Sequence, residues 1–213
     1  MSLNAELRAF NEQGLAQMPP EVVATIQKDL KELQASGLAK RALTEGAFPD
    51  FSLPNALGQR LSLQDILKHG PAVISFYRGS WCPYCNIELR AHQQLLPELQ
   101  ALGAQLIAIS PEQPDHSLSL KEKQSLEFEV LSDSDNQLAK QLGLVFELSL
   151  DLDQLYQQVL QANVAERNGS TSPQLPMPAT YVLNRAGDIV LAHVQEDYAQ
   201  RLEPAEILAA LKA

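Results

Sequence analysis

The two cysteines of this chain are the residues whose type and spacing most clearly indicate chemistry. Cys82 and Cys85 are the only cysteines in 213 residues, and they stand three positions apart within Trp81-Cys-Pro-Tyr-Cys85. Residues at i and i+3 of a helix share a face and can form a disulfide across one turn. A helix that begins near Cys82 would also lower the pKa of that thiol, because free N–H groups and the helix dipole favour the thiolate. The pair is therefore predicted to be a redox-active dithiol.

Two other roles of a C-x-x-C pair fit less well. A structural zinc site needs four ligands. The sequence contains no second C-x-x-C, and its four histidines do not show H-x-x-x-H spacing. We therefore expect no metal and no cofactor. A chance pair of core cysteines is also disfavoured, because the pair directly follows an apolar run that ends at Phe76. His92 lies on the same predicted helix without a partner in sequence, and we interpret it as an ordinary residue.

The composition indicates one well-cored domain with an appendage. Hydrophobic residues make up 45% of the chain, and 26 acidic against 16 basic side chains give a formal charge of -10. This charge would repel phosphate backbones, so we expect no nucleic-acid partner. The first residues lack the pattern of a secretory signal, and no apolar run is long enough for a membrane span. We expect a cytoplasmic protein, and in a reducing cytosol a lone cysteine pair is more often catalytic or redox-sensing than structural.

The chain is expected to consist of an N-terminal helical extension, residues 1–40, and an α/β domain, residues 41–213. Helical patterns cover 3–12 and 20–36, and the apolar stripe of the second helix predicts packing on its own domain or, alternatively, a homodimer contact. In the domain, a strand at 72–78, a helix to about 102 and a strand at 105–110 predict a parallel crossover.

Antiparallel hairpins are predicted on either side of this parallel unit. Residues 51–63 alternate around an Asn/Gly turn, and residues 179–193 form two apolar runs around a Gly turn, before a last helix at 205–212. Together these elements predict a central mixed sheet flanked by helices. Residues 145–174 depart from a minimal α/β unit and are predicted to be a helical insertion, whose helix would begin at a capping box, Asp151-x-x-Gln154.

This order of elements resembles the thioredoxin fold over residues 48–212. Trp81-Cys-Pro-Tyr-Cys85 resembles the thioredoxin active site, and Met177-Pro178-Ala-Thr-Tyr181 resembles the cis-proline segment that faces it. The resemblance implies that the Pro178 peptide bond is cis and that Met177 offers its backbone N–H and C=O to an extended substrate.

A finer resemblance is to the peroxiredoxins of the alkyl hydroperoxide reductase and thiol-specific antioxidant family, in particular to a peroxiredoxin-like branch that carries a C-x-x-C. It rests on Phe51-Ser-Leu-Pro-Asn, on Leu131-Ser-Asp-Ser-Asp135 and on the insertion. Aligned from Phe76-Tyr77, the family's active-site proline, threonine and peroxidatic cysteine fall on Arg78, Cys82 and Cys85, and its later arginine falls on Pro178. Three of the four catalytic residues are thus replaced, which predicts slow peroxide reduction, because a lost positioned donor costs roughly 10²- to 10³-fold in rate.

The resemblance implies an antioxidant thiol oxidoreductase that reduces peroxides through a Cys82/Cys85 dithiol–disulfide cycle and is recycled by a thioredoxin-type reductant. The alternatives are a protein dithiol–disulfide reductase with little peroxidase activity and a non-catalytic redox sensor. Helix position favours Cys82 as an exposed, low-pKa nucleophile, whereas the peroxiredoxin alignment favours Cys85. The residues expected to support the site or bind substrate are Trp81, Pro83, Arg78, Met177 and Pro178.

Overall fold

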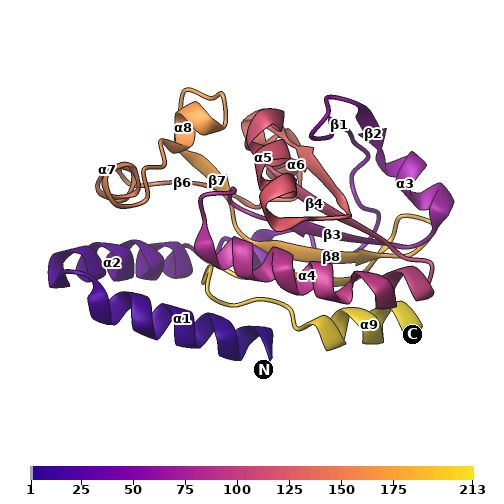
Figure 1. Ribbon diagram of the computed structural model, residues 1–213, viewed down its shortest axis with the longest axis horizontal. Helices are drawn as coiled ribbons and strands as arrows, with labels where there is room; N and C mark the ends of the chain where they lie inside the picture. Colours follow the sequence, from indigo (N-terminus) through magenta and orange to yellow (C-terminus); the bar gives the residue numbers. More distant parts are fainter. Residues whose placement is uncertain (1) are drawn as a thin grey trace.

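The core of the protein is a five-stranded sheet, described by a computed structural model for residues 2–213 (Figure 1). The strand order is β5-β4-β3-β8-β9. β3 pairs in parallel with β4, and β4 with β5, whereas β8 runs antiparallel to β3 and β9 runs antiparallel to β8. The expected central mixed sheet is confirmed. Its strands are β3 (Ala72–Phe76), β4 (Gln105–Ser110), β5 (Glu129–Ser132), β8 (Ala179–Leu183) and β9 (Ile189–Val194).

Helices cover both faces of this sheet, and α4 and α9 lie along the same face (Figure 1). No helix within residues 2–213 is long and apolar enough to cross a membrane. The helices are α1 (Leu3–Gln17), α2 (Pro20–Ser36), α3 (Leu63–His69), α4 (Pro83–Ala101), α5 (Pro114–Gln124), α6 (Gln137–Gln141), α7 (Leu150–Val159), α8 (Val164–Arg167) and α9 (Pro204–Lys212). The predicted N-terminal hairpin is confirmed as β1 (Ser52–Pro54) paired with β2 (Arg60–Ser62).

Strand β3 lies at the centre of the sheet, and all five of its residues are buried. Successive side chains of a strand point to opposite faces, so β3 contributes to two separate cores. Ile74 and Phe76 pack in the core that includes α3 and α6, whereas Val73 packs in the core formed with α4 and α9. Cys82 and Cys85 belong to this second core. The strand therefore fixes the end of the sheet at which the dithiol stands.

The two N-terminal helices pack against different parts of the domain. Leu3 and Leu7 of α1 form a small apolar cluster with Ile87 of α4. The backbone N–H groups of Leu3 and Asn4 donate to the Glu203 carboxylate at 3.0 and 2.9 Å, which ties the start of α1 to the start of α9. Helix α2 has no fully buried residue and packs beside α7. The N-terminal helices thus contribute a wall near the dithiol.

The insertion contains more structure than the predicted helix. Strands β6 (Val145–Glu147) and β7 (Gln174–Pro176) form a separate antiparallel ladder, and α7 and α8 lie between them in sequence. The predicted capping box at Asp151 is wrong, because α7 begins earlier. The hydroxyl of Ser149 accepts the N–H of Leu152 at 3.1 Å and so satisfies one of the free donors of the first turn.

The predicted cis bond at Pro178 is also wrong, since no peptide bond within residues 2–213 is cis. The N–H of Met177 donates to the Leu144 carbonyl at 2.8 Å, which prolongs the β6–β7 pairing almost to the first residue of β8. The chain therefore stays extended as it enters β8. Met177 is buried in the core opposite the one that contains the cysteines. Its N–H is consequently not free for a substrate, contrary to the expectation from thioredoxin.

Candidate active site

The dithiol stands at the start of α4, as the sequence predicted. Cys82 is the residue that caps the helix, Pro83 occupies the first helical position, and Cys85 lies in the first turn. Pro83 suits this position because the first N–H of a helix has no partner within the helix. The N–H of Asn86 donates to the Cys82 carbonyl at 3.0 Å, which closes the first turn. Both cysteines are free thiols.

Both cysteines are buried, which makes the expectation of an exposed Cys82 wrong. The exposed fraction is 0% for each. Trp81 and Tyr84 pack against the core that contains both cysteines. The Trp81 ring lies 5.2 Å from that of Tyr156, which belongs to the insertion, and the Tyr84 ring lies 5.2 Å from that of Tyr198, in the segment before α9. The aromatic surroundings of the site therefore include elements far away in the sequence.

The guanidinium of Arg78 contacts the first sulfur directly. Its Nη2 donates to Cys82 Sγ at 3.1 Å, and its Nη1 donates to the Tyr156 hydroxyl at 2.9 Å. The charged group also lies 4.2 Å from the ring centroid of Tyr198, a cation–π distance. The arginine is only 3% exposed. A buried cation with these partners stabilises negative charge on the Cys82 sulfur.

The pKa values of the two thiols are shifted in opposite directions. Burial alone would raise the pKa of Cys82, but hydrogen bonding with Cys85 and the charges of Arg78 and Arg201 lower it to about 5. Burial raises the pKa of Cys85 well above its usual value, and the hydrogen bond to Cys82 and the negative charge of Cys82 add to the rise. At neutral pH the pair is therefore a thiolate at Cys82 and a thiol at Cys85.

A second buried arginine stands behind Cys85. Arg201 Nε donates to Glu88 Oε2 at 2.6 Å, and its Nη2 lies within hydrogen-bonding range of Cys85 Sγ at 3.7 Å. Both charged side chains are buried, and His92 Nε2 lies 3.8 Å from the other oxygen of Glu88. Burial lowers the pKa of His92, and the imidazole is therefore neutral at neutral pH. His92 is thus part of a buried polar cluster, not the ordinary residue expected from the sequence.

A clamp of three polar residues holds the loop between β3 and Cys82. The buried carboxylate of Glu112 accepts from the Ser80 backbone N–H at 2.5 Å and from Arg167 Nε at 2.8 Å. Arg167 also donates to the Ser80 hydroxyl at 2.9 Å. A side chain at Gly79, where φ is +154°, would collide with the Trp81 indole. The loop that carries Arg78 is therefore held by the Glu112 and Arg167 contacts on one side and by the Trp81 indole on the other.

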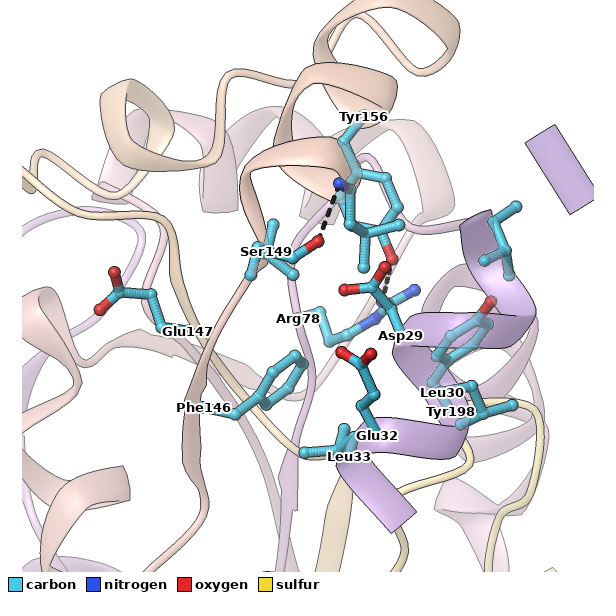
Figure 2. A pocket seen from close by; sticks show the side chains of 13 residues that line it. Asp29, Leu30, Glu32, Leu33, Arg78, Phe146, Glu147, Ser149, Tyr156 and Tyr198 are labelled. Atoms are coloured by element: carbon cyan, nitrogen blue, oxygen red, sulfur yellow. Dashed lines mark hydrogen bonds between the residues drawn. The ribbon is translucent and has the colours of Figure 1, made fainter. Parts of the chain in front are cut away.

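A cavity of about 280 Å³ opens beside Arg78 (Figure 2). Helix α2 forms one wall, and β6 and α7 form the other. Figure 2 shows Asp29 and Glu32 of α2 directed toward the space that the Arg78 guanidinium borders. Most of the remaining lining is apolar, namely Ile26, Leu30, Leu33, Phe146, Leu148 and Leu152. The site thus combines a thiolate, a cation and an adjoining apolar space.

The structure brings together five of the seven residues predicted for the site. Trp81, Cys82, Pro83 and Cys85 surround the helix start, and Arg78 contacts the first sulfur. Met177 packs in the opposite core, and Pro178 directly precedes β8, which pairs with β3.

Sequence reasoning missed Arg201, Glu88, Tyr156 and Tyr198. Glu88 could have been found, because Cys85, Glu88 and His92 follow i, i+3, i+7 spacing on the apolar face of the helix. Arg201 carries no such signal, since it lies 116 positions from Cys85 in the sequence.

The fold and the site agree with what comparison with known proteins shows. A model of the AhpC/TSA family matches residues 45–192. Peroxiredoxin Bcp of Escherichia coli K12 is 31% identical over 96 residues, which are 45% of this chain and 61% of the length of that relative.

Solved structures show the same fold. Peroxidoxin BcpB of Mycobacterium tuberculosis superposes with a TM-score of 0.62 at 21% identity, covering 79% of this chain and 96% of that one. Peroxiredoxin Q of Xanthomonas campestris superposes with a TM-score of 0.59 at 23% identity, covering 76% of this chain and 89% of that one. These neighbours confirm the expected thioredoxin-like fold. Because the family model spans well over half of the sequence, this chain belongs to the AhpC/TSA family.

Proposed function

We propose that this protein is a thiol-dependent peroxidase that cycles between a Cys82/Cys85 dithiol and a disulfide. The observation that carries the proposal is the 3.1 Å hydrogen bond from Arg78 Nη2 to Cys82 Sγ at the start of α4, with Cys85 in the same helical turn. Peroxide reduction by a thiol needs a thiolate and a donor for the leaving oxygen. Both are supplied here by residues of one loop.

Cys82 is the attacking residue in this mechanism. Its thiolate attacks the terminal oxygen of the hydroperoxide, the O–O bond breaks, and the leaving alkoxide takes up a proton and departs as an alcohol or water. The sulfur becomes a sulfenic acid. Arg78 stands where the family's proline is expected in the alignment, yet its guanidinium faces the sulfur. We infer that it replaces the arginine missing at Pro178, and we expect a smaller loss of rate than the three missing family residues alone would predict.

Cys85 completes the cycle. Its thiol condenses with the sulfenic acid of Cys82, which forms the disulfide and releases water. A thioredoxin-type dithiol then supplies two electrons and two protons through thiol–disulfide exchange, and both cysteines return to the reduced state. Arg201, 3.7 Å from Cys85 Sγ, stabilises the negative charge that develops on this sulfur as the thiol loses its proton during the condensation.

Two features of the structure argue against the alternative function, a protein dithiol–disulfide reductase. It requires a sulfur that a protein substrate can reach and a groove beside a cis-proline. Both sulfurs are buried, and the Pro178 bond is trans. A small peroxide needs less access than a protein loop does, so the geometry favours the peroxidase.

Steady-state peroxide consumption with thioredoxin, thioredoxin reductase and NADPH tests the proposal. We expect turnover by the wild type, no reaction of Cys82→Ser with peroxide, and a single oxidation without recycling for Cys85→Ser. Mass spectrometry of the oxidised wild type should show one 82–85 disulfide. Turnover of a protein disulfide without peroxide consumption would favour the reductase, and oxidation without any turnover would favour the sensor. If the variant that retains only Cys85 reacts faster with peroxide, the roles of the two cysteines are reversed.

A further inference from the structure

The cavity between α2 and α7 is a second feature of the site, and one wall of it lies outside the part of the chain that the family model matches. That match begins at residue 45, whereas α2 spans Pro20–Ser36. Helix α2 contributes Ile26, Asp29, Leu30, Glu32 and Leu33 to the lining. The selectivity of this cavity is therefore a property of this chain, not one that follows from the family domain.

The cavity adjoins the dithiol at Arg78, although neither cysteine is among the residues that line it. Arg78 lines the cavity and also donates to Cys82 Sγ. Its third nitrogen, Nε, is buried and has no hydrogen-bond partner among residues 2–213. Buried donors are rarely left unsatisfied, so this nitrogen is suited to a ligand oxygen at the inner end of the cavity. An oxygen bound there would be held by the guanidinium that also holds the thiolate.

A hydroperoxide group matches the polar atoms at this end. Asp29 Oδ2 is buried and likewise has no partner among the described residues. It can accept the O–H of a hydroperoxide while Arg78 Nε donates to one of its oxygens. The remaining walls are mostly apolar and take an organic group. A cavity of about 150 Å³ is enough for benzene, and the present cavity of about 280 Å³ has room for one ring with a branched substituent.

Charge decides which organic hydroperoxide is favoured. Asp29 and Glu32 are directed toward the space beside Arg78 (Figure 2), and the Cys82 thiolate already occupies one side of the guanidinium. A carboxylate on the substrate would meet these two like charges in a partly apolar environment, and Glu147 is a third acidic residue in the lining. We propose that this cavity selects neutral, one-ring-sized hydroperoxides over carboxylate-bearing ones, with Asp29 and Glu32 as specificity-determining residues. The inference rests on the proposed peroxidase function.

A matched pair of substrates tests it: cumene hydroperoxide and its para-carboxylate. We expect kcat/KM of the wild type to favour the neutral compound by roughly tenfold or more, the size of effect that a few like charges give at a partly screened site. Asp29→Asn with Glu32→Gln should reduce that ratio by about tenfold, because the double variant removes the two carboxylates nearest Arg78, leaves Glu147 in place and does not change the shape. Glu21→Gln, on an exposed position of α2 outside the cavity, should leave the ratio unchanged.

A binding measurement separates failure of this inference from failure of the peroxidase proposal. Trp81, the only tryptophan of the chain, lies 5.2 Å from the ring of Tyr156, which lines the cavity. Its fluorescence should change when the neutral product alcohol, 2-phenyl-2-propanol, binds the reduced protein, and change less with the para-carboxylate alcohol.

If the wild type consumes no peroxide, the peroxidase proposal fails, and these two alcohols still decide the selectivity of the cavity. Equal kcat/KM for both hydroperoxides in a protein that turns over hydrogen peroxide would overturn the inference alone. So would a ratio that the double variant does not change, or binding of neither alcohol.

Discussion

Arg201 and Glu88 form an ion pair in which both side chains are only about 1% exposed, with 2.6 Å between Nε and Oε2. The same guanidinium lies 3.7 Å from Cys85 Sγ through Nη2. A buried pair of this kind contributes little compared with an apolar pair of similar volume, but it is costly to break. Arg201 therefore contributes both to the stability of α4, through Glu88, and to the electrostatic environment of Cys85.

The first prediction concerns this pair. Arg201→Met should lower the free energy of unfolding by about 3–5 kcal/mol, because it leaves the Glu88 carboxylate buried without a cation. Glu88→Leu should lower the free energy of unfolding by a similar amount, because it leaves the Arg201 guanidinium buried without an anion. The double variant should cost clearly less than the sum of the two, and urea unfolding of all four proteins measures this coupling. Additive losses would show that the two charges do not depend on one another.

The second prediction concerns the pKa of the attacking thiol. Arg78→Met should raise the pKa of Cys82 from about 5 toward its ordinary value, because the variant removes the cation that donates to Sγ at 3.1 Å. The pKa of Cys82 in Arg78→Lys should lie between those in the wild type and in Arg78→Met, because lysine keeps the charge and loses the fixed guanidinium geometry. The ultraviolet absorbance of the thiolate, followed across pH in the reduced wild type and in reduced Arg78→Met, reports this pKa without requiring a reagent to enter the site, because the raised pKa of Cys85 separates its titration from that of Cys82. An unchanged midpoint in Arg78→Met would assign the shift to other groups.

The same shift predicts how stability depends on pH. The pKa of Cys82 is about 5 in the folded protein against an ordinary value of 9.0, so between these values the unfolded chain binds more protons. The contribution of Cys82 is therefore complete above pH 9, decreases as pH falls, and is lost below pH 5.

Comparison of reduced wild type with Cys82→Ser isolates this contribution. The difference in unfolding free energy should increase by up to about 1.4 kcal/mol per pH unit between pH 5 and 9, the value that corresponds to one pKa unit. A difference that stays constant across this range would mean that Cys82 keeps its proton in the folded state.

The sequence predicted those features of the fold that depend on local pattern. The apolar run of β3, the proline at the start of α4 and the Gly turn between β8 and β9 each specify their element within a few positions. The cysteine spacing likewise placed both thiols in one helical turn. Local physics determines these features, and a single sequence is enough to recognise them.

The errors concern contacts between distant segments. Cys82 was expected to be exposed because its neighbours in sequence do not show that Tyr156 and Tyr198 pack around Arg78, Trp81 and Tyr84 beside it. Pro178 was expected to be cis by resemblance, whereas the Leu144 carbonyl, which binds the N–H of Met177, keeps the chain extended there. None of these three partners can be found from spacing, because Tyr156 belongs to the insertion, Tyr198 to the segment before α9, and Leu144 directly precedes β6.

The last prediction concerns what oxidation does to the buried site. A Cys82–Cys85 disulfide removes the thiolate that faces Arg78. No carboxylate lies within 4 Å of the Arg78 nitrogens among residues 2–213, so this guanidinium would then be buried without an anionic partner. Burying a charge without compensation is costly, and the loop of residues 77–82 should therefore open more readily in the oxidised protein. Hydrogen exchange followed by mass spectrometry should show faster exchange in this loop and no change in α9.

Reduced Cys82→Ser is the matched control, because it also lacks the thiolate but cannot form the disulfide. It should show the same faster exchange if charge is the cause, and the wild-type rate if the change comes from the disulfide itself. The opening has a consequence for turnover. In the reduced structure both sulfurs are buried, so the proposed thioredoxin-type reductant could reach the proposed disulfide only after the groups around it move. Equal or slower exchange in the oxidised protein would contradict this account, and the reductant would then have to act on a site that stays closed.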